Sequence, residues 1–260
     1  NFNHSFIFFL FCHIFSLTIL KFESLVFSPL FCLLLILSIG VSHGSLDHIK
    51  GKKLLKIFEI KNMYIFYLLY IFIASTVIVL WTIMPSISLT IFLIVASFHF
   101  GKEDTQFLIA ENSYYNQLLF FLKGLLVILA PMFFHFEETI SIFKLLLIDN
   151  ESFYRTLDFI EMNNLILFGI ILSTLSSILL FTKEFELKKF TIFLDYFSIL
   201  IINYYLSPLM AFTIYFCFLH STRHGITLMH ELDENDLKNG LKIFIRKALP
   251  LTILTATFCL

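Results

Sequence analysis

Residues 64–84 read YIFYLLYIFIASTVIVLWTIM, and this run contains no charged side chain. A helix needs about 20 mostly apolar residues to cross the hydrocarbon core of a bilayer, so this stretch alone is long enough to span a membrane. The whole chain shares this character, because 58% of its 260 residues are hydrophobic and only 14% are charged. About a quarter of the residues of a typical soluble domain are charged. The composition therefore predicts an all-α, polytopic integral membrane protein.

Further apolar runs on both sides of residues 64–84 predict a bundle of about eight or nine transmembrane helices, forming one membrane-embedded domain over residues 1–260. The predicted spans are residues 4–20, 25–41, 64–84, 87–100, 117–135, 165–182, 190–205 and 208–219, with a ninth opening at Leu249. The sequence begins without Met and stops inside an apolar run, so we expect residues to be missing at one or both ends.

Charged residues in the loops predict the orientation of the bundle in the cell (inner) membrane. Lysine and arginine are concentrated in residues 50–61, 183–189 and 223–247, whereas residues 136–164 are rich in Asp and Glu. Basic residues accumulate in cytoplasmic loops, so we expect the three basic segments inside and the acidic segment outside. The net charge of -1 provides no basic field, which argues against nucleic-acid binding. No Gly-rich phosphate loop or Ser-His-Asp arrangement stands out.

Histidines lie at the predicted inner ends of three spans that are far apart in sequence. They belong to the motifs SHGSLDH (42–48), SFHFG (97–101) and LHSTRH (219–224). Imidazole is the commonest metal-binding side chain, and it is costly at membrane depth unless it is paired or liganded. The sequence therefore predicts one buried metal site near the cytoplasmic ends of the helices, built from His43, His99, His220 and His224.

Local spacing refines this prediction. If the helix continues past Leu219, His220 and His224 are four residues apart and lie on one face, as in a two-histidine metal clip. His43 and Asp47 have the same spacing, whereas His48 points elsewhere and stays open between a ligand, a neighbour of the ligands and an interfacial residue. The remaining histidines have no partner motif and are predicted not to be ligands: His4, His13, His135 and His230.

Nearby carboxylates are expected to orient the metal ligands. A metal-bound histidine commonly donates its other ring N–H to a carboxylate or carbonyl. Proximity in sequence favours Asp47 for the first motif and Glu103 or Asp104 for His99. Arg223 is expected to anchor a carboxylate or to reach the lipid headgroup zone.

The three motifs together, HGSLDH (43–48), HFGKED (99–104) and HSTRH (220–224), resemble those of the Brp/Blh family of beta-carotene 15,15'-dioxygenases. The resemblance extends from about Gly40 to Gly225. It implies an iron-dependent membrane oxygenase that uses O2 to cleave the central double bond of beta-carotene into two molecules of retinal, often for a microbial rhodopsin. It also implies that His43, His99, His220 and His224 hold Fe(2+), and it leaves His48, in the first motif, without a settled role. Asp47 and Asp104 would then orient the ligand histidines as hydrogen-bond acceptors.

Two alternative functions remain beside this one. HSTRH also resembles the H-x-x-x-H box of membrane fatty-acid desaturases and hydroxylases, but those diiron enzymes use additional H-x-x-H-H boxes, which this sequence lacks. A metal or lipophile transporter would distribute polar residues through the membrane depth rather than in one layer.

A carotene-cleaving enzyme additionally requires a long, dry, apolar tunnel that opens toward the lipid.

Overall fold

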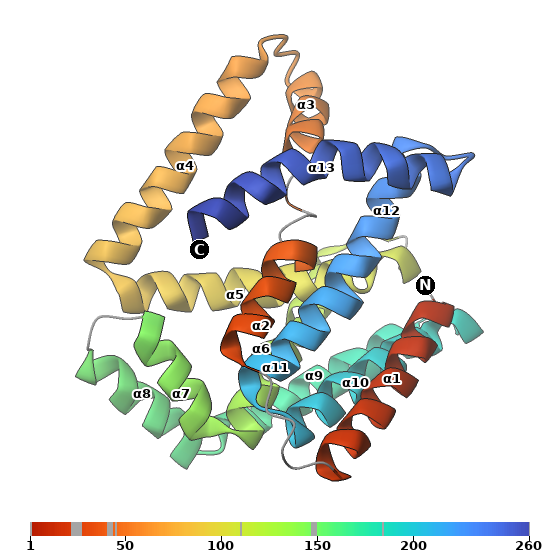
Figure 1. Ribbon diagram of the computed structural model, residues 1–260. Helices are drawn as coiled ribbons and strands as arrows, with labels where there is room; N and C mark the ends of the chain where they lie inside the picture. Colours follow the sequence, from red (N-terminus) through yellow and green to blue (C-terminus); the bar gives the residue numbers. More distant parts are fainter. Residues whose placement is uncertain are drawn as a thin grey trace.

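The computed structural model describes residues 2–21, 28–40, 44, 46–109, 111–146, 150–183 and 185–259, and over these residues the chain is helical without any strand (Figure 1). This confirms the predicted all-α class. The α-helices are α1 (Phe2–Lys21), α2 (Pro29–Leu35), α3 (Asp47–Ile57), α4 (Met63–Ile83), α5 (Pro85–Glu103), α6 (Tyr114–Phe134), α7 (Phe136–Leu146), α8 (Glu151–Met162), α9 (Leu165–Thr182), α10 (Phe190–Tyr205), α11 (Pro208–Ile214), α12 (Thr222–Leu232) and α13 (Leu237–Cys259).

Shorter helical elements complete the chain. Those with bounds in the described part of the chain are the π-helices η1 (Ile36–Gly40) and η5 (Tyr215–Ser221) and the 3-10 turns η3 (Gln106–Leu108) and η4 (Leu187–Lys189). Polar caps start several of the apolar helices, because a side-chain oxygen accepts from an N–H of the first turn that has no partner within the helix. Asn62 caps α4, Ser113 caps α6 and Asn150 caps α8 in this way.

Five helical segments among the described residues are long and apolar enough to cross a membrane. They are Phe2–Lys21, Met63–Ile83, Pro85–Leu108, Tyr114–Phe134 and Leu165–Thr182. The expected count of eight or nine is therefore not confirmed, because the other predicted spans correspond to shorter or composite helices. α10 has 16 residues, and the predicted span at 208–219 is a seven-residue α-helix that continues into η5 and α12.

α5, α6 and α9 pack closely through small residues. A Cβ atom placed on Gly101 of α5 would lie 1.8 Å from the Phe120 carbonyl oxygen, and one on Gly124 of α6 would lie 1.8 Å from the Ser97 carbonyl oxygen. Across the next interface, the Ser173 hydroxyl of α9 donates to the Lys123 carbonyl at 3.0 Å. Small residues and hydroxyl groups at helix interfaces are typical of membrane bundles. This packing fixes the end of α5 that carries His99.

The two π-helices lie against each other and lead toward the histidine motifs. Gly40, the last residue of η1, lies so close to Phe216 of η5 that a Cβ atom would meet the ring at 2.3 Å. η5 contains His220, and η1 ends three residues before His43, which lies outside the described residues. Single π-turns inside α-helices occur frequently at functional sites, because they change the direction of the side chains that follow.

α4 stands apart from the core. None of its residues is buried, and it forms a hairpin with α3 beside α13 (Figure 1). The predicted loop 50–61 is mostly helix, since α3 reaches Ile57, and the acidic segment 136–164 forms α7 and α8. The ninth apolar helix begins at Leu237 rather than at Leu249, because its first turns are amphipathic and carry lysines that a search for apolar runs rejects.

Candidate functional site

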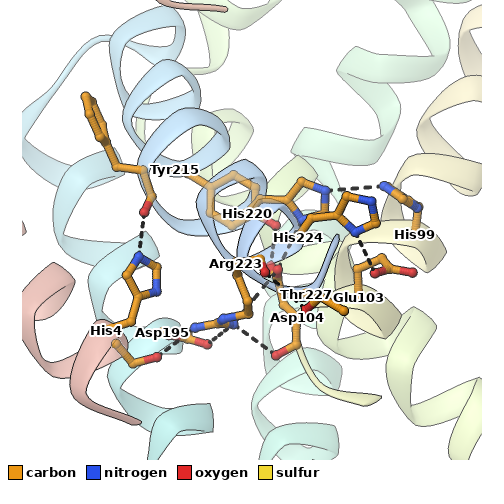
Figure 2. Close-up of polar contacts among 12 residues, drawn as sticks. His4, His99, Glu103, Asp104, Asp195, Tyr215, His220, Arg223, His224 and Thr227 are labelled. Atoms are coloured by element: carbon orange, nitrogen blue, oxygen red, sulfur yellow. Dashed lines mark hydrogen bonds and ion pairs between the residues drawn. The ribbon is translucent and has the colours of Figure 1, made fainter. Parts of the chain in front are cut away.

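His220 of η5 is the centre of a buried polar cluster (Figure 2). Its side chain is 1% exposed, and its Nδ1 lies 3.0 Å from Oδ1 of Asp104. Its Nε2 lies 3.3 Å from Nε2 of His99, which α5 contributes. A carboxylate can only accept, so Nδ1 carries the proton that is donated to Asp104. In the neutral imidazole the lone pair is then on Nε2, which faces His99.

Asp104 is itself held in place from a second side. The hydroxyl of Tyr215, one π-helical turn before His220, donates to Asp104 Oδ2 at 2.6 Å. The two carboxylate oxygens are thus used by two different donors, and the orientation of His220 is fixed through Asp104. Phe100 packs edge-on against the His220 ring at 4.9 Å between centroids, and Phe216 stacks on it at 5.9 Å. These aromatic rings help to shield the His220 ring from water.

His224 of α12 repeats the same arrangement. Its Nδ1 donates to Glu103 Oε2 at 3.1 Å, and its Nε2 accepts from Nζ of Lys50, which α3 contributes, also at 3.1 Å. His220 and His224 are therefore both in the tautomer with a lone pair on Nε2. Figure 2 shows the His224 ring beside those of His220 and His99.

The donor chemistry suits a metal ion, although the described residues do not make a complete site. Two imidazole nitrogens that each lie about 2.1 Å from one ion in a tetrahedral arrangement are about 3.4 Å apart, close to the 3.3 Å between His99 Nε2 and His220 Nε2. Histidines that donate Nδ1–H to carboxylates are typical metal ligands. Among the described residues, no group of three or more His, Cys, Asp or Glu side chains has the arrangement of a metal site. His43 lies outside those residues, so its role as a ligand stays a prediction.

A second buried network of polar side chains adjoins the first at Asp104. Arg223, which is 2% exposed, donates from both Nη atoms to the carboxylate of Asp195 at 2.9 and 3.1 Å. Nη1 also donates to the Asp104 carbonyl at 3.0 Å, and Nη2 donates to the Ser5 hydroxyl at 2.7 Å. Arg223 therefore connects α1, α10 and the end of α5. Of the two roles expected for Arg223, the structure confirms that it anchors a carboxylate.

The carboxylate partners differ from those that sequence proximity favoured. Asp104 contacts His220 and Glu103 contacts His224, and in the described part of the chain neither carboxylate forms a hydrogen bond with His99. The reason is that both carboxylates follow His99 on the last turn of α5, where they face η5 and α12. Asp47 is the first residue of α3, and it accepts from the Tyr70 hydroxyl at 3.2 Å. Its expected pairing with His43 stays a prediction.

The other histidines occupy varied positions. His48 of α3 lines two cavities beside α4 and α13. His13 bonds to the Phe9 carbonyl of its own helix at 3.0 Å, as expected for a residue outside the site. His4 is more involved than we expected, since its Nε2 lies 2.9 Å from the Phe218 carbonyl in η5, where it ties α1 to the π-helix.

Several residues of the site are not found by motif reasoning. Asp195, which pairs with Arg223, is an ionisable residue inside an apolar run, and such residues mark functional or structural sites in membrane proteins. That signal was available in the sequence but was not used. Tyr215 and Lys50 gave no comparable signal, because one is a tyrosine among many aromatic residues and the other belongs to a lysine-rich segment.

Over the residues that the structure describes, these observations define an all-helical protein with five candidate membrane spans and a buried cluster of histidine–carboxylate pairs. A family model described as Beta-carotene 15,15'-dioxygenase matches residues 34–260. The chain belongs to this family. All three histidine motifs lie inside the matched range.

A similar protein is the Beta-carotene 15,15'-dioxygenase of uncultured marine bacterium 66A03, which is 26% identical to this chain over 194 residues. The aligned stretch covers 74% of this chain and 66% of the length of that protein. No solved structure matches the chain.

Proposed function

We propose that this chain is a multi-pass enzyme of the cell (inner) membrane that uses Fe(2+) and O2 to cleave the central 15,15' double bond of beta-carotene into two molecules of all-trans-retinal. The observation that supports this most strongly is the family match over residues 34–260, which contains the histidine cluster. We also propose that the shorter helices complete a bundle of eight or nine membrane spans. The retinal product would provide a functional link to a retinal-binding rhodopsin.

In this proposal His43, His99, His220 and His224 hold the iron, which supplies the activation of O2 when bound. Asp104 and Glu103 orient His220 and His224, because each carboxylate accepts a hydrogen bond from Nδ1 and so directs Nε2 toward the ion. Lys50, which donates to His224 Nε2 in this structure, would move away from that nitrogen when iron binds. A set of neutral imidazoles suits Fe(II).

The remaining residues hold these carboxylates and exclude water. Tyr215 keeps Asp104 oriented toward His220, and Arg223 holds the Asp104 backbone. Phe100 and Phe216 surround His220 with aromatic carbon. Oxidative cleavage of a hydrocarbon double bond needs no general base.

A cavity of about 470 Å³ provides the most suitable access for a carotenoid. Phe66, Tyr67 and Tyr70 of α4 form one wall, and Leu251 of α13 forms another. Gly44 also lines this cavity and is the residue after His43 in sequence. Aromatic and aliphatic walls suit a polyene, and α4, which has no buried residue, would face the lipid in which carotene dissolves.

Bacteria engineered to accumulate beta-carotene test the proposal. Expression of the chain is expected to bleach the orange colour and to yield retinal, measured by chromatography of cell extracts. His220→Ala is expected to abolish both effects, whereas His13→Ala, a matched histidine that bonds within its own helix, is expected to leave them unchanged. Carotene that persists beside well-expressed, iron-loaded wild-type protein would refute the function, and aldehydes of unequal length would move the cleavage off centre.

A further inference from the structure

A larger cavity lies at the turn between α3 and α4 and is separate from the histidine cluster. Its volume is about 1060 Å³, and its walls come from α3, the first turns of α4, the end of α12 and the middle of α13. Figure 1 shows the turn that joins α3 to the upper end of α4. The carotenoid-access cavity adjoins it, since His48 and Tyr67 line both. The proposed function does not use this larger cavity.

The rim of the cavity is basic. Lys52 and Lys56 are four residues apart on α3 and therefore lie on one face of that helix, Lys61 follows in the turn, and Lys247 comes from α13. All four are exposed. Within the described part of the chain, the lining contains one acid, Glu59. Four positive charges thus converge from three segments around a single carboxylate.

Protein carboxylates do not neutralise these four lysines. The neighbouring Lys53 pairs with Glu231 at 2.6 Å, but Lys53 does not line the cavity. Lys50 points away to His224. Over the residues that the structure describes, no ion pair joins any of the four cavity lysines to an acid of the chain. Their charge is therefore available to a bound anion.

The floor of the same cavity is apolar. Leu55, Ile60, Met63 and Leu232 line it beneath the lysines. A free inorganic anion would leave this surface uncovered, whereas a ligand with a charged head and hydrocarbon chains would cover it and meet the lysines together. α4 continues from this floor as an exposed apolar helix against which hydrocarbon chains can lie.

We propose that this cavity binds the phosphate headgroup of an anionic phospholipid, with its acyl chains on the apolar floor and along α4. Basic pockets between membrane helices recognise anionic headgroups in this way. The bound lipid would hold α3 and α4, which have few contacts with the core, against α13. This inference concerns the lipid surface and is independent of the proposed carotenoid chemistry.

Native mass spectrometry of the full chain in detergent, titrated with phosphatidylglycerol or with phosphatidylcholine, tests the proposal. We expect phosphatidylglycerol to bind more than about 30-fold more tightly, because each of the four lysines beside an anionic lipid contributes about fivefold in affinity. The double variant Lys52→Gln/Lys56→Gln is then expected to bind phosphatidylglycerol about 30-fold more weakly, with phosphatidylcholine binding unchanged. Glu59→Gln is expected to strengthen phosphatidylglycerol binding, since it removes the acid of the rim.

Lys238→Gln/Lys242→Gln is the matched control, because these two lysines are also exposed and four residues apart on a helix but do not line the cavity. Equal binding of the two lipids would overturn the proposal. An equal loss of phosphatidylglycerol binding in the control and cavity variants would also overturn it, since it would indicate a diffuse surface charge. Displacement of the lipid by inorganic phosphate at matched concentration would assign the site to the free anion instead.

Discussion

Replacing Arg223 by Met tests whether the second network supports the histidine cluster. The substitution keeps most of the side-chain volume but removes the guanidinium that joins Asp195, Ser5 and the Asp104 carbonyl. Asp195 is 1% exposed, so water cannot replace the lost donors without a rearrangement of α10. The variant therefore leaves a buried carboxylate without its counter-ion.

The size of the effect follows from this burial. Breaking a buried ion pair by removing one partner costs about 3–5 kcal/mol, because an uncompensated charge remains. The double variant Asp195→Leu/Arg223→Met removes both charges, and what remains is the loss of hydrogen bonds to Ser5 and the Asp104 carbonyl, at about 1 kcal/mol each. We therefore expect the double variant to be less destabilised than Arg223→Met alone.

Equilibrium unfolding in mixed micelles with increasing dodecyl sulfate, followed by far-UV circular dichroism, measures these free energies. Arg155→Met is the control, because Arg155 forms an exposed pair with Glu151 four residues earlier on α8, and its loss is expected to cost less than about 1 kcal/mol. The reasoning is refuted if Arg223→Met is no more destabilised than Arg155→Met. It is also refuted if the free energy of unfolding that the double variant loses equals the sum of the losses in Arg223→Met and Asp195→Leu.

Three further predictions follow from the site, the helix packing and the charge pattern. His220→Ala, like the loss of any other proposed ligand, is expected to remove most of the bound iron, whereas Asp104→Asn is expected to lower iron affinity about 10–100-fold. Metal analysis of purified variants measures both effects, and full iron content in two or more ligand variants would contradict a single site. Gly101→Ala is expected to destabilise the α5–α6 pair strongly, because its Cβ would clash with backbone, whereas Gly225→Ala, whose Cβ would meet only a Met229 methyl at 3.9 Å, is expected to be neutral or stabilising in the same unfolding assay. Cysteine-accessibility labelling in intact cells is expected to place residues 50–61 inside and the acidic segment between α6 and α9 outside, and the reverse result would invert the site.

The sequence predicts the interior helices well because their signal is local. The runs 165–182 and 190–205 coincide with α9 and α10, since α9 contains no charged residue and α10 contains only Asp195. α13 is predicted less well, because its first turns are amphipathic and carry Lys238 and Lys242 before the apolar part begins. A search for apolar runs detects only the second half of such a helix.

The sequence predicts which histidines form the candidate site better than it predicts which carboxylate contacts each histidine. The motifs identify His99 and His220, and the structure brings them to 3.3 Å. The partners depend on how η5 and α12 turn toward the end of α5, and a π-helix changes that direction without a signal in the residue pattern. For this reason Tyr215 and the pairing of Glu103 with His224 emerge only from the fold.

The stoichiometry of the reaction tests the central claim most directly. Purified, iron-loaded protein in detergent would be supplied with beta-carotene and O2, and both carotene and retinal would be quantified by chromatography over time. Cleavage at the 15,15' bond predicts two molecules of retinal for each beta-carotene consumed, with no other aldehyde. Unconsumed beta-carotene, or one retinal-length product beside a longer or shorter aldehyde, would contradict the account.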